Sequence, residues 1–202
     1  MTDSPWSSRD FENLYASVGD DLDLIPWASQ QPHPALVSWL DGQPAGAGRD
    51  TLVVGCGLGD DAAELALRGY RVSAFDYSAT AIGWCRRRFP GSPVDYRVVD
   101  LFDLPAAWNR RFDLVVEINT IQSVPVERRR ETVAAIAGAV APGGFLFLRC
   151  LGRGDDDPAP ERPWAVSRRD LRAFRDEGLR ETAFTEEVRP TGRSYFNLVF
   201  AR

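Results

Sequence analysis

The sequence predicts an α/β protein with a doubly wound, mostly parallel sheet, helices before it and an antiparallel hairpin after it. Between residues 50 and 150, short apolar runs rich in β-branched and aromatic residues alternate with helix-like segments. Glycine or proline separates most of these segments. Strands that alternate with helices form right-handed βαβ units, and the resulting parallel sheet is buried on both faces.

Five strands and three helices are expected in this central region. The expected strands are 51–54, 70–75, 94–98, 112–118 and 145–148. The expected helices are 60–68, 79–89 and 125–140. Asp60 or Asp61 can start the first helix, Gly69 can end it, and Ser78 can cap the second.

The flanking segments complete the expected fold. Ser167 caps a further helix that runs to residue 176, and residues 179–188 and 194–200 form a hairpin that closes one edge of the sheet. Ser7 and Pro34 start two helices near the N-terminus. We expect a single domain over residues 1–202, with cap helices and a linker in 1–45 and a Rossmann-like core in 50–202.

Composition excludes several classes of protein. The net charge of −5 argues against a nucleic-acid partner, although all 24 basic residues are arginine. We interpret the arginine runs 86–88 and 128–130 as solvated helix faces, with anion binding as the alternative. Three scattered cysteines and one histidine predict neither a disulfide framework nor a metal site. No membrane span or secretory signal is visible, so a cytoplasmic protein is expected.

A glycine-rich loop, Gly55-Cys56-Gly57-Leu58-Gly59, stands between the first strand and the first helix. Ligands bind there in open α/β sheets, and glycine lets the backbone approach them closely. A dinucleotide fingerprint has Gly or Ala at the sixth position, but this chain has Asp60 followed by Asp61. Two carboxylates would oppose a pyrophosphate, so the loop favours S-adenosylmethionine (SAM), which carries a sulfonium and no phosphate. A tight turn without a ligand is the alternative.

Acidic residues follow the next two strands. Asp76 can accept hydrogen bonds from both ribose hydroxyls, and Tyr77 can flank the adenine. Asp100 can accept from the adenine amino group, while Leu101 contacts the ring. A helix cap at Asp76 and a surface turn at Asp100 are the alternatives. Because these residues share one edge of the sheet with the glycine loop, they predict a single cofactor pocket.

These segments resemble the motifs of the class I SAM-dependent methyltransferases. Residues 53–59 are similar to the first motif, 75–78 to the second, 100–102 to the third, 112–117 to the fourth, and 141–144 to the turn before strand five. The resemblance covers about residues 50 to 150. It implies a cofactor site that includes Gly55, Cys56, Gly57, Asp76, Tyr77, Asp100, Leu101, Phe102, Glu117 and Ile118.

A second resemblance lies upstream of the sheet. Pro26-Trp27 and the segment 31–36 look like the N-terminal segment of thiopurine and thiol/halide methyltransferases, in which the Trp helps to cover the cofactor. It implies this role for Trp27 and slightly favours a thiol acceptor. The usual Asp-x-Gly after that Trp is replaced by residues 28–30, Ala-Ser-Gln. Core packing is the alternative role for Trp27.

The acceptor side is expected just beyond the fourth strand. Glu117 or the backbone of Ile118 can hold the methionine part of SAM, and Asn119 and Gln122 can orient the acceptor. Glu117 is also a possible general base, with a polar strand-end role as the alternative. His33 is a base only if the N-terminal helices fold over the site, and otherwise a capping or surface residue.

The segment after strand four lacks the Asn/Asp-Pro-Pro-aromatic motif of nucleic-acid amino-methyltransferases. We therefore predict transfer of a methyl group to sulfur, oxygen or nitrogen of a small molecule, by a monomer or homodimer. The N-terminal helices and residues 152–164 are expected to form a lid that excludes water. A non-catalytic SAM-binding regulatory module is the main alternative, and an NAD-type dehydrogenase is a further one.

Overall fold

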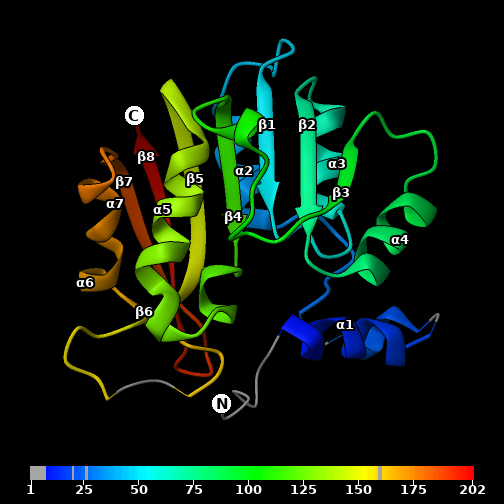
Figure 1. Ribbon diagram of the computed structural model, residues 1–202. Helices are drawn as coiled ribbons and strands as arrows, with labels where there is room; N and C mark the ends of the chain where they lie inside the picture. Colours follow the sequence, from blue (N-terminus) through cyan, green and yellow to red (C-terminus); the bar gives the residue numbers. More distant parts are fainter. Residues whose placement is uncertain (1–7, 20, 26, 159–160) are drawn as a thin grey trace. The chain divides into compact units, whose positions relative to one another are not determined.

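The computed structural model describes residues 8–19, 21–25, 27–158 and 161–202, which form two compact units divided between Asp100 and Leu101 (Figure 1). Ser7 and Pro26, which carried sequence expectations, lie outside the described residues, as do residues 159 and 160 of the expected lid. That the two units form one domain stays a prediction. Among the described residues, no helix has the length and hydrophobicity that a membrane crossing requires.

The first unit is a three-stranded parallel sheet with helices. Its elements are α1 Ser8–Ser17, η1 Leu22–Leu24, α2 Pro34–Asp41, β1 Asp50–Val54, α3 Asp60–Leu67, β2 Arg71–Asp76, α4 Ala79–Arg88 and β3 Asp95–Val98. The strand order is β3-β2-β1. Val54 pairs with Phe75 and Asp76 pairs with Val98, so the ends of the three strands lie side by side. α3 and α4 pack against β2, and α1 packs against α4.

The second unit combines parallel and antiparallel pairing. Its elements are η2 Ala106–Trp108, β4 Phe112–Ile118, η3 Ile121–Ser123, η4 Val126–Arg128, α5 Arg129–Ala139, β5 Val140–Arg153, β6 Val166–Ser167, α6 Arg168–Leu171, α7 Ala173–Asp176, β7 Arg180–Val188 and β8 Ser194–Ala201. The strand order is β4-β5-β8-β7, with β6 beside β5. β4 and β5 are parallel, whereas β8 is antiparallel to both β5 and β7, as the predicted hairpin requires.

Local sequence signals account for several helix ends. The Ser78 hydroxyl accepts a hydrogen bond from the Ala81 N–H at 2.9 Å and caps α4. Ser167 and Asp170 form a capping box at the start of α6. Gly69 follows α3 with φ of 85°, a left-handed conformation that suits glycine after a helix. These three termination and capping predictions are confirmed.

Other boundaries differ from the sequence expectations. The helix expected from residue 125 starts as the 3₁₀ turn η4 and becomes α-helical only at Arg129. The helix expected to run to 176 is divided at Arg172 into α6 and α7. β5 is longer than expected because the Pro-Gly-Gly segment at 142–144 is held in the strand: the Gly143 N–H donates to the Arg202 carbonyl at 3.1 Å. By contrast, α3 begins at Asp60 as expected, with Gly59 at the N-cap position and both acids in the first turn.

Candidate functional site

The glycine loop after β1 adopts a conformation that its glycines make possible. Gly57 and Gly59 have φ of 52° and 86°, in the left-handed region where other residues are strained. A Cβ on Gly59 would lie 2.9 Å from both Cys85 Sγ and Tyr96 Oη. A Cβ on Gly57 would lie 3.2 Å from Tyr15 Oη. Glycine at 59 therefore lets the buried end of the loop pack closely on Cys85 and Tyr96, whereas Gly57 stays partly exposed.

Asp76, at the end of β2, is tied to this loop. Its Oδ2 accepts the Gly57 N–H and its Oδ1 accepts the Ser78 N–H, both at 2.9 Å. Burial raises the pKa of Asp76, while these backbone hydrogen bonds oppose the rise. A carboxylate has about four acceptor positions, and the backbone N–H groups of Gly57, Tyr77 and Ser78 take up to three of them, so at least one remains for a ribose hydroxyl. Asp76 thus caps the backbone before α4 and still has acceptor capacity for a nucleoside.

An aromatic cluster from the N-terminal segment lies over the loop. Trp27 Nε1 donates to Tyr15 Oη at 3.2 Å, and the Trp27 ring packs edge-on against Tyr15 and Phe11 with centroid distances of 6.1 and 5.5 Å. Trp27 is 47% exposed, whereas Tyr15 is buried. Sequence reasoning missed Tyr15 as a site residue, although Phe11 and Tyr15 are spaced by four residues on one face of α1.

Sequence reasoning also missed Glu12, whose hydrogen bonds link α1 to the start of α4. Its carboxylate accepts hydrogen bonds from the Ser78 and Thr80 hydroxyls, each at 2.5 Å. Burial is the largest single effect and raises the pKa of Glu12. The hydrogen bonds together outweigh burial and hold the pKa below its usual range. The sequence gives no signal for this contact because 66 residues separate Glu12 from Ser78.

Both acidic residues at the start of α3 are engaged in hydrogen bonds or an ion pair. Both oxygens of Asp60 bind Arg88 at 2.7 Å. Asp61 accepts the His33 N–H at 2.6 Å, and burial raises its pKa to about 6. The charge argument against a pyrophosphate is therefore weaker than expected, because Arg88 balances Asp60. Position 60 still lacks the Gly or Ala of the dinucleotide fingerprint, and this argues against a dinucleotide ligand.

Three predicted residues of the first unit stand apart from the loop contacts. His33 is the N-cap of α2: its Nδ1 accepts the Ala35 N–H at 3.1 Å, which is the capping role that the sequence left open. Because Nδ1 accepts this hydrogen bond, the neutral ring carries its proton on Nε2, which does not suit a general base. Tyr77 is 45% exposed directly after β2, and Asp100 is exposed after β3. Their contacts with adenine stay predictions.

The arginine runs are not simply solvated faces, which corrects the sequence interpretation. Arg129 is only 6% exposed, and its Nη1 and Nη2 donate to the carbonyls of Ile121 and Trp164 at 2.6 and 3.0 Å. Arg128 lies 3.3 Å above the Phe102 ring, so one face of this predicted cofactor residue is covered. Leu101, its neighbour, is buried.

Glu117 is fully buried at the end of β4. Its Oε1 accepts the N–H groups of Thr120 and Ile121 at 2.6 and 3.0 Å, whereas its Oε2 makes no hydrogen bond to the described part of the chain. Burial raises the pKa of Glu117 to about 7, against smaller opposing effects of these hydrogen bonds and of Arg129. A carboxyl that titrates near neutrality is suited to acid–base chemistry.

Asn119 and Gln122 shape the segment that follows. Asn119 has φ of 64°, and its buried Oδ1 lacks a hydrogen-bond partner among the described residues. Gln122 braces the segment: its Oε1 accepts the Leu151 N–H and its backbone carbonyl accepts the Trp164 N–H at 2.8 Å. Ile118, the last residue of β4, is half-buried. The side-chain oxygen of Gln122 is thus engaged, and only its amide nitrogen remains for an acceptor.

Cysteines and acids do not gather into a metal site in the described ranges, which hold no cluster of three or more potential ligands. Cys56 is half-buried in the glycine loop, where its N–H donates to the Phe75 carbonyl at 2.8 Å. Hydrogen bonding with Cys85, and then burial, raise the pKa of the Cys56 thiol. Cys56 therefore serves the loop through its backbone, with a thiol held protonated.

Comparison with known proteins agrees with this geometry. Residues 52–144 match the model of a methyltransferase domain family. A ubiquinone biosynthesis O-methyltransferase of Thiobacillus denitrificans is 36% identical over 123 residues, which cover 60% of this chain and 52% of that protein. The chain thus spans about half the length of the curated relatives it matches.

Two solved structures share the fold. Magnesium protoporphyrin IX methyltransferase from Synechocystis PCC 6803, with bound SAM, has a TM-score of 0.74 and 19% identity over 100% of both chains. The 1,6-didemethyltoxoflavin-N1-methyltransferase of Burkholderia thailandensis, with bound S-adenosylhomocysteine, has a TM-score of 0.74 and 17% identity over 96% of this chain and 86% of that one. The predicted Rossmann-like fold class is confirmed. The O- and N-methyltransferase names of these relatives do not support the thiol preference. Residues 52–144 are thus similar to a methyltransferase domain family, and the chain shares the fold of solved methyltransferases.

Proposed function

We propose that this chain binds SAM and transfers its methyl group to oxygen or nitrogen of a small molecule. The observation that carries the proposal is the hydrogen bond from the Gly57 N–H to Asp76, which joins the glycine loop to a carboxylate with an acceptor position left. The names of the relatives support oxygen or nitrogen over sulfur as the accepting atom.

When bound, SAM supplies an electrophilic methyl carbon on its sulfonium, and S-adenosylhomocysteine leaves after in-line attack. The protein then has to bind, align and exclude water, and alignment alone can contribute about 7–11 kcal/mol. Asp76 accepts from the ribose hydroxyls, and the loop backbone at Gly57 lies against the ligand. Trp27 and Tyr15 cover the loop and limit access of water.

A protonated acceptor also needs a base, and Glu117 is the residue we propose. Its Oε2 is the carboxyl oxygen left after the turn is capped, and its pKa of about 7 suits proton transfer near neutral pH. Asn119 offers a second oxygen for orienting the acceptor. His33 is a weaker proposal because its Nδ1 caps α2.

Isothermal titration calorimetry with SAM, S-adenosylhomocysteine and NAD tests the cofactor proposal. Native protein should bind the first two and not NAD. Asp76→Ala should weaken binding of S-adenosylhomocysteine by about 1–3 kcal/mol, or roughly five- to 150-fold. Asp103→Ala, at an exposed position, is the matched control. Unchanged affinity in Asp76→Ala would remove its ribose role, and binding of NAD alone would end the proposal.

Turnover is tested separately with a panel of phenols, amines and thiols, with product mass as the readout. Methylated phenol or amine products are expected. Tight SAM binding without any product would favour a regulatory module instead. Products from thiols alone would restore the sulfur preference that the relatives do not support.

A further inference from the structure

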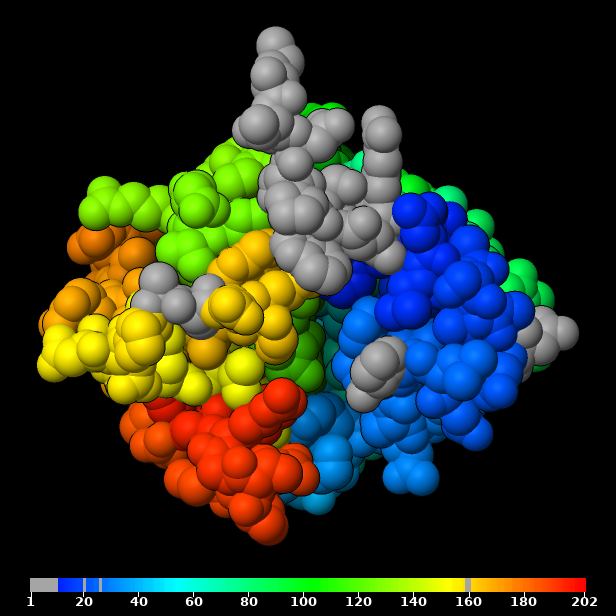
Figure 2. Space-filling model, turned by 90° about the horizontal axis from the view of Figure 1, so that it is seen from below, coloured from blue at the N-terminus to red at the C-terminus, as the bar shows by residue number. Residues whose placement is uncertain are grey.

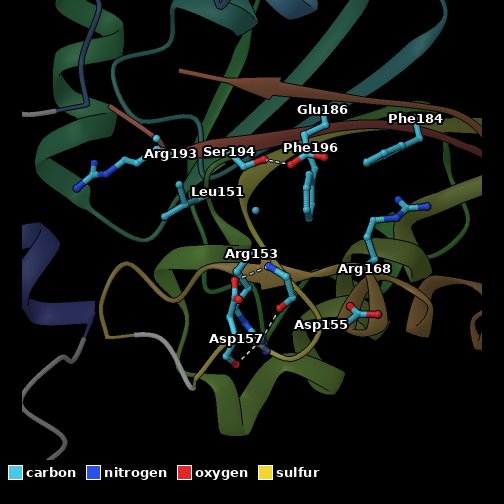
Figure 3. Close-up of a pocket in the computed structure, with 13 residues that line it drawn as sticks. Leu151, Arg153, Asp155, Asp157, Arg168, Phe184, Glu186, Arg193, Ser194 and Phe196 are labelled. Atoms are coloured by element: carbon cyan, nitrogen blue, oxygen red, sulfur yellow. Dashed lines mark hydrogen bonds between the residues drawn. The ribbon is translucent and has the colours of Figure 1, made fainter. Parts of the chain in front are cut away.

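A separate hollow lies within the unit of residues 101–202, at the carboxyl end of β5 (Figure 3). Its volume is about 650 Å³, which is within the range of small-molecule sites. The loop after β5 and the turn of the β7–β8 hairpin border it, and both lie side by side on the face in Figure 2, in yellow and red. None of its lining residues has a role in the site proposed above.

The inner wall of this hollow is aromatic and held in place. The rings of Phe184 and Phe196 meet edge to face, with centroids 5.5 Å apart. A Cβ on Gly152 would lie 2.5 Å from the Phe196 ring, so glycine lets that ring pack directly on the β5 backbone. Phe196 is 4% exposed and Phe184 is 37% exposed. The wall is thus a preformed surface for a flat apolar group.

Polar groups at the rim differ in how fully they are engaged. Arg168 lies 3.9 Å above the Phe184 ring, and its Nη2 binds Glu181 at 2.8 Å. Its Nη1 is buried and makes no hydrogen bond to the described residues. Across the hollow, Glu186 is exposed and accepts from the Ser194 hydroxyl, as the dashed line in Figure 3 shows. One unmatched donor and one exposed acceptor therefore flank the aromatic wall.

The rim has no net charge to select an ion. Arg153, Arg168 and Arg193 are matched by three acidic residues, Asp155, Asp157 and Glu186. Arg153 is also bonded to its own loop, through the carbonyls of Gly154 and Asp157 at 3.1 and 3.3 Å. A carboxylate ligand would meet the three acids, and an ammonium ligand would meet the three arginines. A neutral ligand avoids both costs.

We propose that this pocket binds a neutral aromatic compound that carries a hydroxyl group. The ring lies on the exposed part of Phe184, with Phe196 packed behind it, while the hydroxyl oxygen accepts from Arg168 and its hydrogen is donated to Glu186.

The first experiment measures binding of three probes by calorimetry: 2-naphthol, 2-naphthoate and decahydro-2-naphthol. The neutral flat probe should bind more tightly than the anion and than the non-planar alcohol. Phe184→Ala should weaken 2-naphthol binding roughly three- to tenfold, since it removes one aromatic contact. Val188→Ala, on the same strand but outside the pocket and 67% exposed, should leave the affinity unchanged. Glu186→Gln should weaken the binding of 2-naphthol and of decahydro-2-naphthol by a similar factor, because both probes share the hydroxyl.

Equal 2-naphthol affinity in native protein and Phe184→Ala, or tighter binding of 2-naphthoate, would overturn the pocket assignment. Phe184→Ala should leave the affinity for S-adenosylhomocysteine unchanged, because none of the residues that line this pocket belongs to the proposed cofactor site. If native protein binds 2-naphthol but neither SAM nor S-adenosylhomocysteine, the proposed function fails while the pocket stands.

Discussion

Replacement of Glu117 by Gln should change how the stability of the protein depends on pH. Glu117 is fully buried, and its pKa is raised from the usual 4.5 to about 7, chiefly by burial. The folded state therefore holds the proton more tightly than the unfolded state does. It follows that the free energy of unfolding falls as the pH rises from 4.5 to 7, and that the loss is complete above pH 7.

The size of this effect follows from the pKa change. One pKa unit corresponds to 1.36 kcal/mol, so the rise to about 7 corresponds to about 3 kcal/mol. Gln keeps an oxygen that can accept from the N–H groups of Thr120 and Ile121 but cannot ionise. The free energy of unfolding of Glu117→Gln, relative to that of native protein, should therefore rise by about 3 kcal/mol between pH 4.5 and pH 8.

Urea denaturation of native and variant protein at pH 5, 6, 7 and 8 measures this difference. Other buried acids, such as Asp61 and Asp76, titrate in both proteins, so their effects cancel in the comparison. Glu131→Gln is the matched control, because Glu131 is exposed on α5 and its pKa is lowered by Arg128. A Glu117→Gln stability difference that is the same at pH 5 and pH 8 would refute the reasoning.

Two further predictions concern backbone and capping. Gly59→Ala places a methyl group 2.9 Å from the sulfur of Cys85 and forces alanine into a left-handed conformation. It should destabilise the fold by more than the roughly 1–2 kcal/mol of the conformation alone. Gly91→Ala, which is also left-handed but has open space, isolates that conformational cost; equal melting temperatures for the two variants would exclude the clash. Ser78→Ala removes the α4 cap and a partner of α1, so it should cost about 1–2 kcal/mol in urea. Ser17→Ala, at an exposed position, should stay within about 0.5 kcal/mol, and an equal effect of both would contradict the capping role.

Much of the fold was predictable because its signals are local. The apolar runs at β1 and β4, the Ser78 cap and the hairpin of β7 and β8 each depend on residues close in sequence. Boundaries were less predictable where tertiary hydrogen bonds decide them. The bond from Gly143 to Arg202 keeps β5 extended across a segment whose composition indicates a break.

The candidate site divides in the same way. Glycine at 57 and the acid at 76 were predictable from their places after strands, because the ends of neighbouring parallel strands meet. The partners of Glu12, Arg129 and Asp60 were not predictable, since each contact joins segments separated by several to many residues. The same limit explains why Arg129 was expected to be solvated although it is buried.

By itself, the sequence determined the alternation of strands and helices, the glycine loop between the first strand and helix, and the similarity to a methyltransferase domain family. These follow from residue pattern and spacing, which act over a few residues at a time. Only the tertiary structure decided which carboxyls are paired, which are buried, and that Glu117 titrates near neutrality. Burial and charge pairing depend on atoms brought together from distant parts of the chain, and no local pattern of residues specifies them.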